Sequence, residues 1–197
     1  MRKVVFASNN AGKVREVAAI LAGLDIEVVP QSVYAVPSVE ETGLSFVENA
    51  ILKARHASKH TGLPAIADDS GIEVDLLNGA PGIYSARYAG PGASDADNNA
   101  RLLAALGDAP ESARTARYQC VMVYMRHADD PTPLICQASW EGRVLSAPRG
   151  EGGFGYDPLF LLPELGKTAA EIDAETKNRL SHRGRALRAL LEALRGT

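Results

Sequence analysis

The chain opens with a strand pattern, a polar loop and a helix pattern in immediate succession, and this order limits its fold more than any other feature. Residues 4–7 form an apolar run of strand length. Apolar residues then recur at helical spacing from Val14 to Leu21, and Gly23 provides a stop signal. Residues 26–29 form a second strand pattern. Because strands that alternate with helices pack as a covered sheet, the chain is predicted to be α/β with a mixed sheet.

Later helices are predicted to begin at capping residues, and three of these starts have a Ser or Thr followed three residues later by an acidic residue, as in a capping box. Ser45 with Glu48 predicts an amphipathic helix that runs to about His60. The other predicted starts are Ser94 with Asp97, for a helix toward Leu106; Thr168 with Glu171, for a helical region; and Ser181, for a last helix with Leu187, Leu190, Leu191 and Leu194 on its apolar face and an end near Gly196.

Strand patterns occupy much of the remaining sequence. Residues 64–75, PAIADDSGIEVD, are predicted to form a strand, an acidic turn and a second strand. Residues 115–128 and 133–145 are long strand candidates and are predicted to pair as an antiparallel hairpin. The segments rich in glycine and proline, residues 77–94 and 148–160, are predicted to be loops.

The whole chain, residues 1–197, is predicted to be a single domain of two lobes without a clean boundary. Its 197 residues suffice for one large domain or for two lobes that share a core. The sequence shows no internal repeat, no low-complexity tract and no linker that separates two domains. Because polar glycine loops fall at both ends of the sequence, we expect two lobes with a central cleft between them.

Composition and charge argue against several classes of protein. The net charge of −3 does not suit a general nucleic-acid binder, which needs a basic field to engage phosphates along a strand. No apolar stretch approaches the length that spans a bilayer, and the strand-like start does not have the pattern of a signal peptide. We therefore expect no membrane partner and a cytoplasmic location. Cys120 and Cys136 lack metal-site spacing and are expected to be buried, reduced thiols.

Residues 8–13, SNNAGK, have the character of a phosphate-binding loop but do not form a Walker loop. Gly12 and Lys13 match the end of the Walker motif. Ala7 and Val14, however, replace its first glycine and its metal-binding hydroxyl. The segment still suits an anion, because it combines turn-forming donors, a glycine that admits backbone amides, a helix N-terminus and a lysine charge. The alternative is an ordinary strand-to-helix turn with a solvated lysine.

Because this loop has no hydroxyl to hold a metal ion, carboxylates elsewhere in the chain must supply the ligands. Asp68 and Asp69 follow an apolar strand, where paired acids repel each other unless a cation offsets them. Glu40 and Glu41 precede the predicted helix at Ser45, and for them solvent exposure is the simpler interpretation. Mg²⁺ prefers one or two carboxylates together with waters and substrate phosphates, so one carboxylate from each segment would suit it.

Six motifs extend this interpretation over nearly the whole chain. In order they are SNNAGK, EETGLSFVENAILKA, ADDSG, GAPGIYSARY, GGFGYDPLF and LSHRGRAL. Together they resemble the noncanonical purine nucleoside triphosphate pyrophosphatases, also called inosine triphosphate or dITP/XTP pyrophosphatases, and no motif position departs from the family pattern. The resemblance implies a homodimeric α/β enzyme that needs Mg²⁺ and has an elongated mixed sheet flanked by helices. It would hydrolyse inosine and xanthosine triphosphates, ribo or deoxy, to the monophosphate and pyrophosphate.

The resemblance also implies roles for individual residues. Asp69 would be a metal ligand and the general base, and Glu40 would be the second metal ligand. Ser70 would contact the substrate, and Lys53 would assist in binding the triphosphate. The triphosphate would bind to Ser8, Asn9, Asn10, Ala11, Gly12 and Lys13, and the base pocket would comprise Phe154, Gly155, Tyr156, Asp157, Lys177, His182 and Arg183.

These roles agree with the chemistry of cleavage between the α- and β-phosphates. A metal ion and the two lysines would stabilise charge on the phosphate oxygens, and a carboxylate can accept the proton of the attacking water. Two choices stay open: whether Asp69 is that base or only a ligand, and whether Glu40 or Glu41 is the second ligand. Donors in the base pocket would satisfy the 6-keto oxygen of hypoxanthine or xanthine but would face another donor in adenine. Phe154, between glycines, offers a ring face for stacking on the base.

Two other classes of function remain alternatives on the residues alone. A phosphotransferase or a general nucleoside triphosphate phosphatase would explain the phosphate-binding loop, although a phosphotransferase also needs a site for an acceptor. A non-enzymatic nucleotide or RNA binder would explain the basic residues but not the acidic segments. The products formed from inosine triphosphate separate these classes. Pyrophosphate would indicate a pyrophosphatase, orthophosphate a phosphatase, and no turnover of any nucleotide a binding protein.

Overall fold

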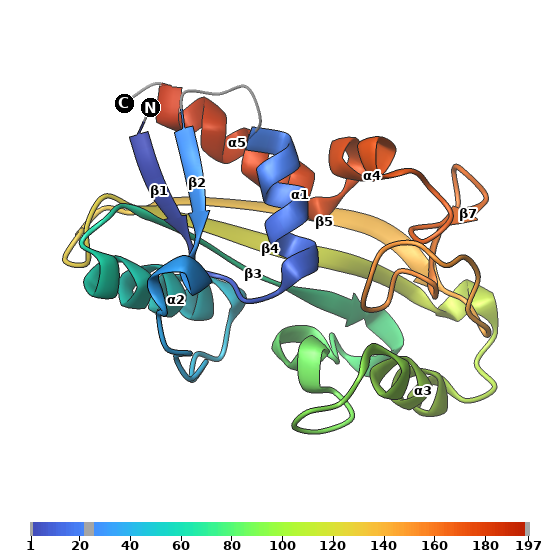
Figure 1. The fold of residues 1–197 in the computed structure, drawn as a ribbon. Helices are drawn as coiled ribbons and strands as arrows, with labels where there is room; N and C mark the ends of the chain where they lie inside the picture. Colours follow the sequence, from blue (N-terminus) through green and yellow to red (C-terminus); the bar gives the residue numbers. More distant parts are fainter. Residues whose placement is uncertain (1, 22–25, 196–197) are drawn as a thin grey trace. The chain divides into compact units, whose positions relative to one another are not determined.

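The computed structural model describes residues 2–21 and 26–195, and it shows the predicted α/β architecture with helices flanking a sheet (Figure 1). The predicted helix stops at Gly23 and near Gly196 lie outside these residues. The strands within these two ranges are β1 (Arg2–Phe6), β2 (Ile26–Pro30), β3 (Ala65–Val74), β4 (Thr115–Met125), β5 (Leu134–Val144), β6 (Phe160–Leu162) and β7 (Lys167–Thr168).

The sheet is mixed, as predicted. Its hydrogen-bonded strand order is β2-β1-β3-β4-β5-β6-β7. Strand β1 pairs in parallel with β2 and with β3. Strand β6 pairs antiparallel with β5 and with β7. The two long strands predicted to be neighbours, β4 and β5, are adjacent in this order.

The α-helices begin where side chains can satisfy the free amide groups of a first turn. Ser45 accepts a hydrogen bond from the Glu48 amide at the start of the second helix. Ser94 and Asp97 form a complete capping box at the start of the third. The α-helices in the described residues are α1 (Ala11–Leu21), α2 (Phe46–Thr61), α3 (Asp95–Leu106), α4 (Ala174–Leu180) and α5 (His182–Arg195).

The chain forms two compact units, and each unit is assembled from separate stretches of sequence. Unit 1 contains the described residues of Met1–Asp69, Cys120–Ala138 and Arg183–Thr197, and unit 2 contains Ser70–Gln119 and Ser139–His182. Strands β3, β4 and β5 contribute residues to both units.

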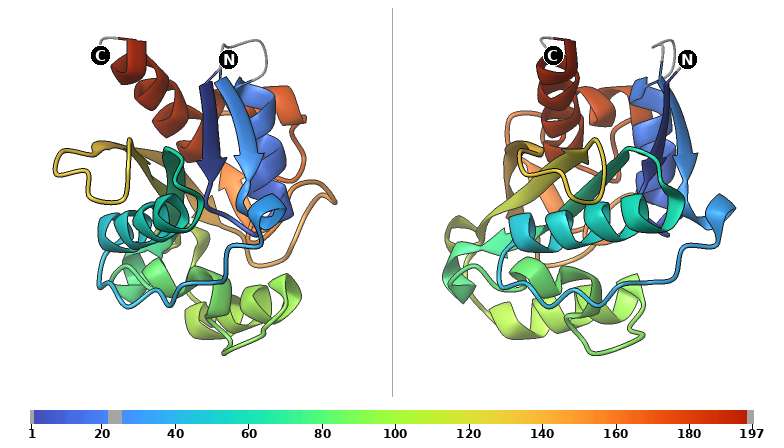
Figure 2. Two further views of the ribbon diagram at one scale, coloured as in Figure 1. Left: turned by 60° about the vertical axis from the view of Figure 1, so that its left-hand side comes forward. Right: turned by 90° about the vertical axis from the view of Figure 1, so that its left-hand side faces the viewer.

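Unit 1 is built on strands covered on both faces, and their period-two alternation decides which residue meets which helix. Even-numbered residues of β1, β3 and β4 pack against α1 and α5, whereas odd-numbered residues pack against α2. Figures 1 and 2 show α2 and the α1–α5 pair on opposite sides of these strands. The first cluster includes Val4, Phe6, Ile66, Cys120 and Met122, and the second includes Val5, Ala65, Ala67, Val121 and Val123.

Unit 2 has its own core, in which α3 covers strand residues and aromatic rings. Tyr118 of β4 and Phe160 of β6 lie with ring centroids 4.5 Å apart, and Trp140 of β5 lies 5.5 Å from Phe160. Leu102 and Leu106 of α3 are buried in the same cluster. The core of unit 2 therefore differs from that of unit 1 in being rich in aromatic side chains.

The prediction of an acidic turn within residues 64–75 is wrong, because these residues include one continuous ten-residue strand, β3. Asp68 and Asp69 lie inside this strand and are buried. The prediction rested on the local pattern, in which two acidic residues are followed by Ser70 and Gly71. In the structure each carboxylate is paired with a lysine in the interior, so the strand continues through both residues.

A second prediction, of a helical start at Thr168 and Glu171, is also wrong. Thr168 ends β7, and the helix α4 begins only after Asp173, whose carboxylate caps it by accepting from the Thr176 amide. The Glu171 carboxylate accepts from the Thr168 amide, so the pair closes a turn rather than a helix. The predicted loop at residues 77–94 is also more ordered than expected, since it contains a 3-10 helix at Gly82–Arg87.

Both cysteines are free thiols, as predicted, but only Cys120 is buried. Burial raises the pKa of the Cys120 thiol to about 12, so little reactive thiolate forms at neutral pH. No helix in the described ranges has the length and apolar character required to cross a membrane.

Removal of the Ser94 hydroxyl tests the capping of α3. The change Ser94→Ala should lower the free energy of unfolding by about 1 kcal/mol, because the Asp97 amide loses its acceptor. Urea unfolding followed by circular dichroism measures the difference. As a control, Ser32→Ala at an exposed serine should shift it by less than about 0.5 kcal/mol. Equal effects of the two changes would contradict a capping role for Ser94.

Candidate active site

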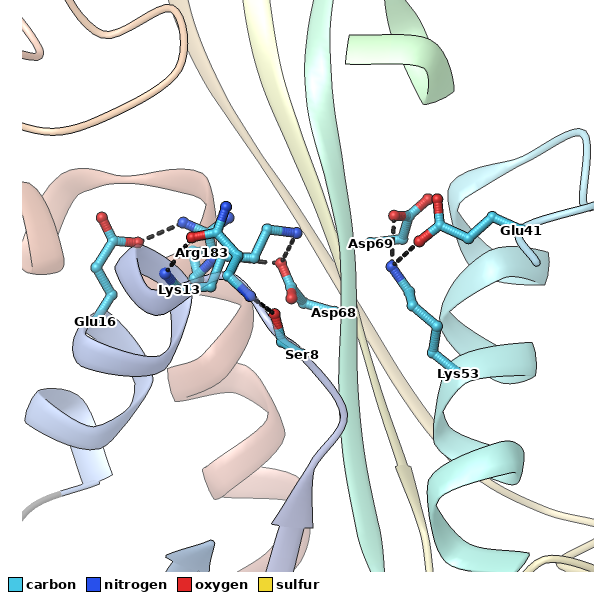
Figure 3. Close-up of polar contacts among 9 residues, drawn as sticks. Ser8, Lys13, Glu16, Glu41, Lys53, Asp68, Asp69 and Arg183 are labelled. Atoms are coloured by element: carbon cyan, nitrogen blue, oxygen red, sulfur yellow. Dashed lines mark hydrogen bonds and ion pairs between the residues drawn. The ribbon is translucent and has the colours of Figure 1, made fainter. Parts of the chain in front are cut away.

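Two consecutive carboxylates of β3, Asp68 and Asp69, organise the candidate site in unit 1. Successive side chains of a strand point to opposite faces, so Asp68 faces α1 and α5 while Asp69 faces α2 (Figure 3). Both are buried, with exposed fractions of 1% and 5%. Each face provides one lysine, Lys13 for Asp68 and Lys53 for Asp69. We refer to these four residues as the lysine–carboxylate cluster.

On the α1–α5 face, Asp68 is held by two cations from different helices. Lys13 of α1 donates to Asp68 Oδ2 at 2.9 Å, and Arg183 of α5 donates to the same oxygen at 3.3 Å. Arg183 also donates to Glu16, one turn after Lys13 on α1. Glu16 and Asp68 thus hold Arg183, itself only 2% exposed, between α1 and β3 (Figure 3).

The charges of this network keep Asp68 ionised. Burial disfavours the charged carboxylate, but Lys13 and then Arg183 outweigh it and hold the pKa of Asp68 well below its usual range. Burial likewise disfavours the charged guanidinium of Arg183, and Asp68 and Glu16 offset this effect and raise its pKa. Asp68 therefore stays negatively charged, and its carboxylate holds the side chains of Lys13 and Arg183 in place.

On the α2 face, Lys53 lies between two carboxylates. Its ammonium group is 2.8 Å from Asp69 Oδ1 and 2.8 Å from Glu41 Oε1. Burial alone would lower the pKa of Lys53, but Asp69, Asp68 and Glu41 raise it. The pKa of Asp69 is raised, because its burial outweighs the opposing charge of Lys53. Asp69 is consequently a stronger base than an ordinary exposed aspartate.

Glu41 reaches this face because the segment before α2 is pinned to the helix. The Gly43 amide donates to Oδ1 of the buried Asn49 at 2.8 Å. A Cβ at Gly43 would lie 2.5 Å from Cβ of Glu48, so only glycine fits this approach. Asn49 precedes Lys53 by one helical turn, so both side chains face the same side of α2.

The predicted metal ligands fit a divalent cation in part. Asp69 Oδ2 is buried and accepts no hydrogen bond from any described residue, so it has an unused acceptor site. Glu41 shares Lys53 with Asp69, whereas Glu40 is exposed. No group of three or more His, Cys, Asp and Glu residues in the described ranges is arranged to hold a metal alone. Such a pair matches Mg²⁺, which takes one or two carboxylates and completes its shell with water and phosphate.

The predicted phosphate-binding loop, residues 8–13, is a strand-to-helix turn with its own internal bonds. Asn10 Oδ1 accepts from the Lys13 amide at 3.1 Å, and the Asn10 amide donates to Ser8 Oγ at 3.2 Å. Asn9 Oδ1 accepts from Gln31 at 3.0 Å. Ala11 and Gly12 form the start of α1, where a helix N-terminus favours an anion. These hydrogen bonds hold the turn in one conformation, and the turn therefore fixes the position on α1 from which the Lys13 side chain extends.

The predicted base-pocket residues of unit 2 gather around Asp157. Its Oδ2 accepts from Lys177 at 2.6 Å and from the Phe154 amide at 2.9 Å. The Lys177 ammonium lies 4.6 Å from the centre of the Phe154 ring, within the range of a cation–π contact. A Cβ at Gly153 would lie 2.1 Å from Asp157 Oδ2, so the loop can wrap around this carboxylate only with glycine there.

Other predicted site residues have structural partners in the same units. The Tyr156 hydroxyl donates to the Ser85 carbonyl at 2.7 Å, and the Gly155 amide donates to Asp95 at 2.6 Å. His182 is buried at the start of α5, and Ser70 lies within β3. These contacts fix the conformation of the loop at residues 153–157. Contacts of this loop with a ligand stay predictions.

Two residues of these clusters were not predicted to belong to a site. Glu16 holds Arg183, and its only signal in the sequence was its place one turn after Lys13. Tyr118 contacts Asp157 and His182, and in the sequence it stood within an ordinary strand pattern, between Arg117 and Gln119. The fold alone brings both to their partners, because each partner lies far along the chain.

Taken together, the fold and site define an α/β protein in which two half-buried lysines are paired with two consecutive, buried strand carboxylates. More particularly, the chain belongs to the Ham1 family, whose model matches residues 4–193.

Curated relatives match over nearly their full lengths. The dITP/XTP pyrophosphatase of Thioalkalivibrio sulfidiphilus is 66% identical over 98% of this chain and 99% of its own length. The dITP/XTP pyrophosphatase of Escherichia coli O157:H7 is 60% identical over 99% of each chain.

Solved structures agree. A HAM1 protein from Coxiella burnetii gives a TM-score of 0.92 at 50% identity and covers 100% of both chains. The Staphylococcus aureus Ham1 protein gives 0.86 at 41% identity, with 99% of each chain covered. At these identities the comparison supports the family assignment as well as the fold.

Replacement of Asp68 tests the electrostatic role of its buried carboxylate. The change Asp68→Asn should lower the free energy of unfolding at pH 7 by about 3 kcal/mol, because it leaves Lys13 and Arg183 with less compensation. A depressed pKa in the folded state stabilises only above the unfolded pKa of 3.8. The difference between wild type and variant should therefore shrink as pH falls below about 4.

Urea unfolding at pH 7 and at pH 3 provides the measurement. Glu27→Gln, which removes an exposed pair with Lys3 at 3.8 Å, is the control and should change stability by less than about 1 kcal/mol. A difference for Asp68→Asn that is equally large at both pH values would rule out ionisation as its cause.

Proposed function

We propose that this protein hydrolyses noncanonical purine nucleoside triphosphates, ITP, dITP, XTP and dXTP, to the nucleoside monophosphate and pyrophosphate. The relatives named dITP/XTP pyrophosphatases support this substrate class. The structural observation that carries the proposal is the lysine–carboxylate cluster, in which two half-buried lysines flank two consecutive, buried strand carboxylates. A phosphotransferase or a general triphosphatase would need the same grip on phosphate, so the products decide between them.

Binding of the triphosphate is the task of the two lysines and the turn at residues 8–13. Lys13 and Lys53 are held by Asp68 and Asp69 before any ligand arrives, so little side-chain entropy is lost when phosphates bind. Each lysine places a full charge where negative charge develops on the phosphate oxygens. The backbone amides at the start of α1 add further donors.

We assign Mg²⁺ to Asp69 and Glu41. When bound, it would neutralise phosphate charge and improve the leaving group. Asp69 offers an oxygen without a hydrogen-bond partner among the described residues, and Glu41 shares Lys53 with it. The geometry favours Glu41 over the Glu40 that the resemblance implies, because the Glu40 side chain is exposed.

Asp69 is also our candidate for the general base. A carboxylate of this kind can take the proton of the attacking water and return it to solvent after cleavage. Lys53, bonded to the other oxygen of Asp69, holds the carboxylate in one orientation during this transfer.

Recognition of the base is assigned to Phe154, Lys177 and His182 of unit 2, with Arg183 as a further candidate. Phe154 offers a ring for stacking, and Lys177 and His182 offer donors for the 6-keto oxygen of hypoxanthine or xanthine. Adenine presents an amino group at that position, so a donor would be left unpaired and binding would weaken. The homodimer implied by the resemblance and the cytoplasmic location expected from the sequence stay predictions.

Product analysis is the direct test of the reaction. With Mg²⁺, the protein should release pyrophosphate and the monophosphate from ITP and XTP, and much less from ATP. Pyrophosphate detection coupled with chromatography of the nucleotides provides the measurement. Orthophosphate as the product would indicate a phosphatase, and no turnover of any nucleotide would indicate a binding protein; either result would overturn the proposal.

Replacing Asp69 should remove most of the turnover. Asp69→Asn should lower kcat by at least about 100-fold at saturating Mg²⁺, which is the usual contribution of a general base. Lys53 would keep an uncharged oxygen as its acceptor, so the fold should persist. Turnover near that of wild type at saturating Mg²⁺ would show that Asp69 is not the base.

Neighbouring glutamates offer a matched test of the second metal ligand. Glu41→Gln should weaken Mg²⁺ binding at least roughly 10-fold, as losing one supporting residue of a metal site commonly does, and Glu40→Gln should have little effect. Isothermal titration with Mg²⁺ in the absence of nucleotide measures this separately from activity. The reverse result would restore Glu40 as the ligand.

A further inference from the structure

Tyr118 occupies a position in unit 2 from which it contacts two residues predicted to form the base pocket. It is 7% exposed and lies near the end of the unit 2 part of β4. Its ring is parallel to the His182 imidazole, with centroids 4.6 Å apart and an interplanar angle of 9°. Its hydroxyl donates to Asp157 Oδ1 at 3.2 Å. One side chain thus touches both the imidazole and the carboxylate that anchors the loop at residues 153–157.

The ring of Tyr118 is itself held by the sheet. Phe160, a fully buried residue of β6, lies 4.5 Å from it with the two ring planes tilted by 52°. Trp140 of β5 lies 6.5 Å from the Tyr118 ring and 6.4 Å from that of His182. His182 therefore rests on a stack of aromatic side chains that come from three strands rather than on a mobile loop.

The orientation of an imidazole decides what it can recognise. Both ring nitrogens and their lone pairs or protons lie in the plane of the ring. Hydrogen bonds weaken steeply as the donor, hydrogen and acceptor depart from a line. A ring whose plane is fixed by stacking can therefore direct a donor at one acceptor position, whereas a freely rotating ring cannot.

We propose that Tyr118 is a positioning residue for base selectivity: by stacking on His182 it sets the plane of the imidazole that distinguishes a 6-keto from a 6-amino purine. The inference rests on the proposed function, since it assumes that His182 contacts the base. Tyr118 itself acts through His182 and is not assigned a contact with the substrate.

The two parts of the Tyr118 side chain contribute unequally. The bond from its hydroxyl to Asp157 is long, and Asp157 also accepts from Lys177 at 2.6 Å and from the Phe154 amide at 2.9 Å. The ring, in contrast, stacks nearly parallel on the His182 imidazole, with centroids 4.6 Å apart. Phenylalanine should consequently replace Tyr118 with little loss, and an aliphatic residue should not.

Kinetic selectivity provides the first test, in the full-length protein with Mg²⁺. The quantity is the ratio of kcat/KM for ITP to that for ATP. Tyr118→Leu should lower this ratio by roughly 3- to 10-fold, the effect of losing one well-directed hydrogen bond. Tyr118→Phe should keep it within about 2-fold, because the stack survives.

Tyr124 supplies the matched control. It lies six residues further along the same strand, is 3% exposed, and belongs to the core of unit 1. Tyr124→Leu should lower the melting temperature as Tyr118→Leu does, but it should leave the ITP-to-ATP ratio unchanged. If both leucine variants change the ratio equally or not at all, or if Tyr118→Phe lowers it as much as Tyr118→Leu, the proposal is overturned.

A spectroscopic test does not depend on activity or on the folding of a leucine variant. Stacking on Tyr118 should shift the imidazole proton signals of His182 upfield of those of the exposed His127 in the proton NMR spectrum. The signals are assigned by their loss in His182→Gln. Tyr118→Phe should retain the shift, and its absence in the wild type would overturn the proposal.

These measurements also separate this inference from the proposed function. If the wild-type protein released no pyrophosphate from ITP, the proposed function would be overturned, even if the NMR shift confirmed the stacking of Tyr118 on His182. Normal pyrophosphate release with a selectivity ratio insensitive to Tyr118→Leu would leave the proposed function intact and overturn only the role of Tyr118.

Discussion

Two negative charges on consecutive residues of a buried strand are the constraint around which unit 1 is built. Asp68 and Asp69 point to opposite faces, so no single cation can serve both at close range. The first helix after β1 brings Lys13 to one face, and α2 brings Lys53 to the other. Removing Lys53 would take the ion-pair partner from the buried Asp69, and removing Lys13 would leave the buried Asp68 with Arg183 alone. Breaking a buried ion pair in this way costs several kcal/mol. The placement of both helices is thus linked to the chemistry of the site.

The elements with strong periodic patterns were predictable, and the exceptions have one physical cause. The Ser94 capping box and the apolar strand β1 appear where the sequence placed them. The acidic turn at Asp68 and Asp69, and the helix start at Thr168, were predicted from local preference alone. At Asp68 and Asp69, lysines distant in the sequence provide the compensating charge. At Thr168, pairing with the neighbouring strand β6 holds the residue in a strand. Tertiary contacts of this kind leave no mark within a short window of sequence.

Much the same holds for the site. The loop at residues 8–13 and the acidic pair could be recognised, because turn formers, a glycine and a lysine follow one another in sequence. The bond between Lys13 and Asp68 could not, since it joins residues on separate elements. Neither could the position of Tyr118 on His182, because tyrosine in a strand usually indicates only a half-buried surface. Sequence indicated the components, and the fold determined which of them meet.

Because each unit is assembled from separate stretches of sequence, neither unit can be separated from the other by a simple cut in the chain. The polypeptide passes between unit 1 and unit 2 four times, three of them inside strands β3, β4 and β5. Neither unit is therefore a contiguous gene segment, and no single cut in the chain releases one of them whole. A single breakpoint after Asp69 would keep all four residues of the lysine–carboxylate cluster but would separate them from the unit 1 residues of β4, β5 and α5. Such a protein is expected to diversify by point substitution rather than by exchange of modules.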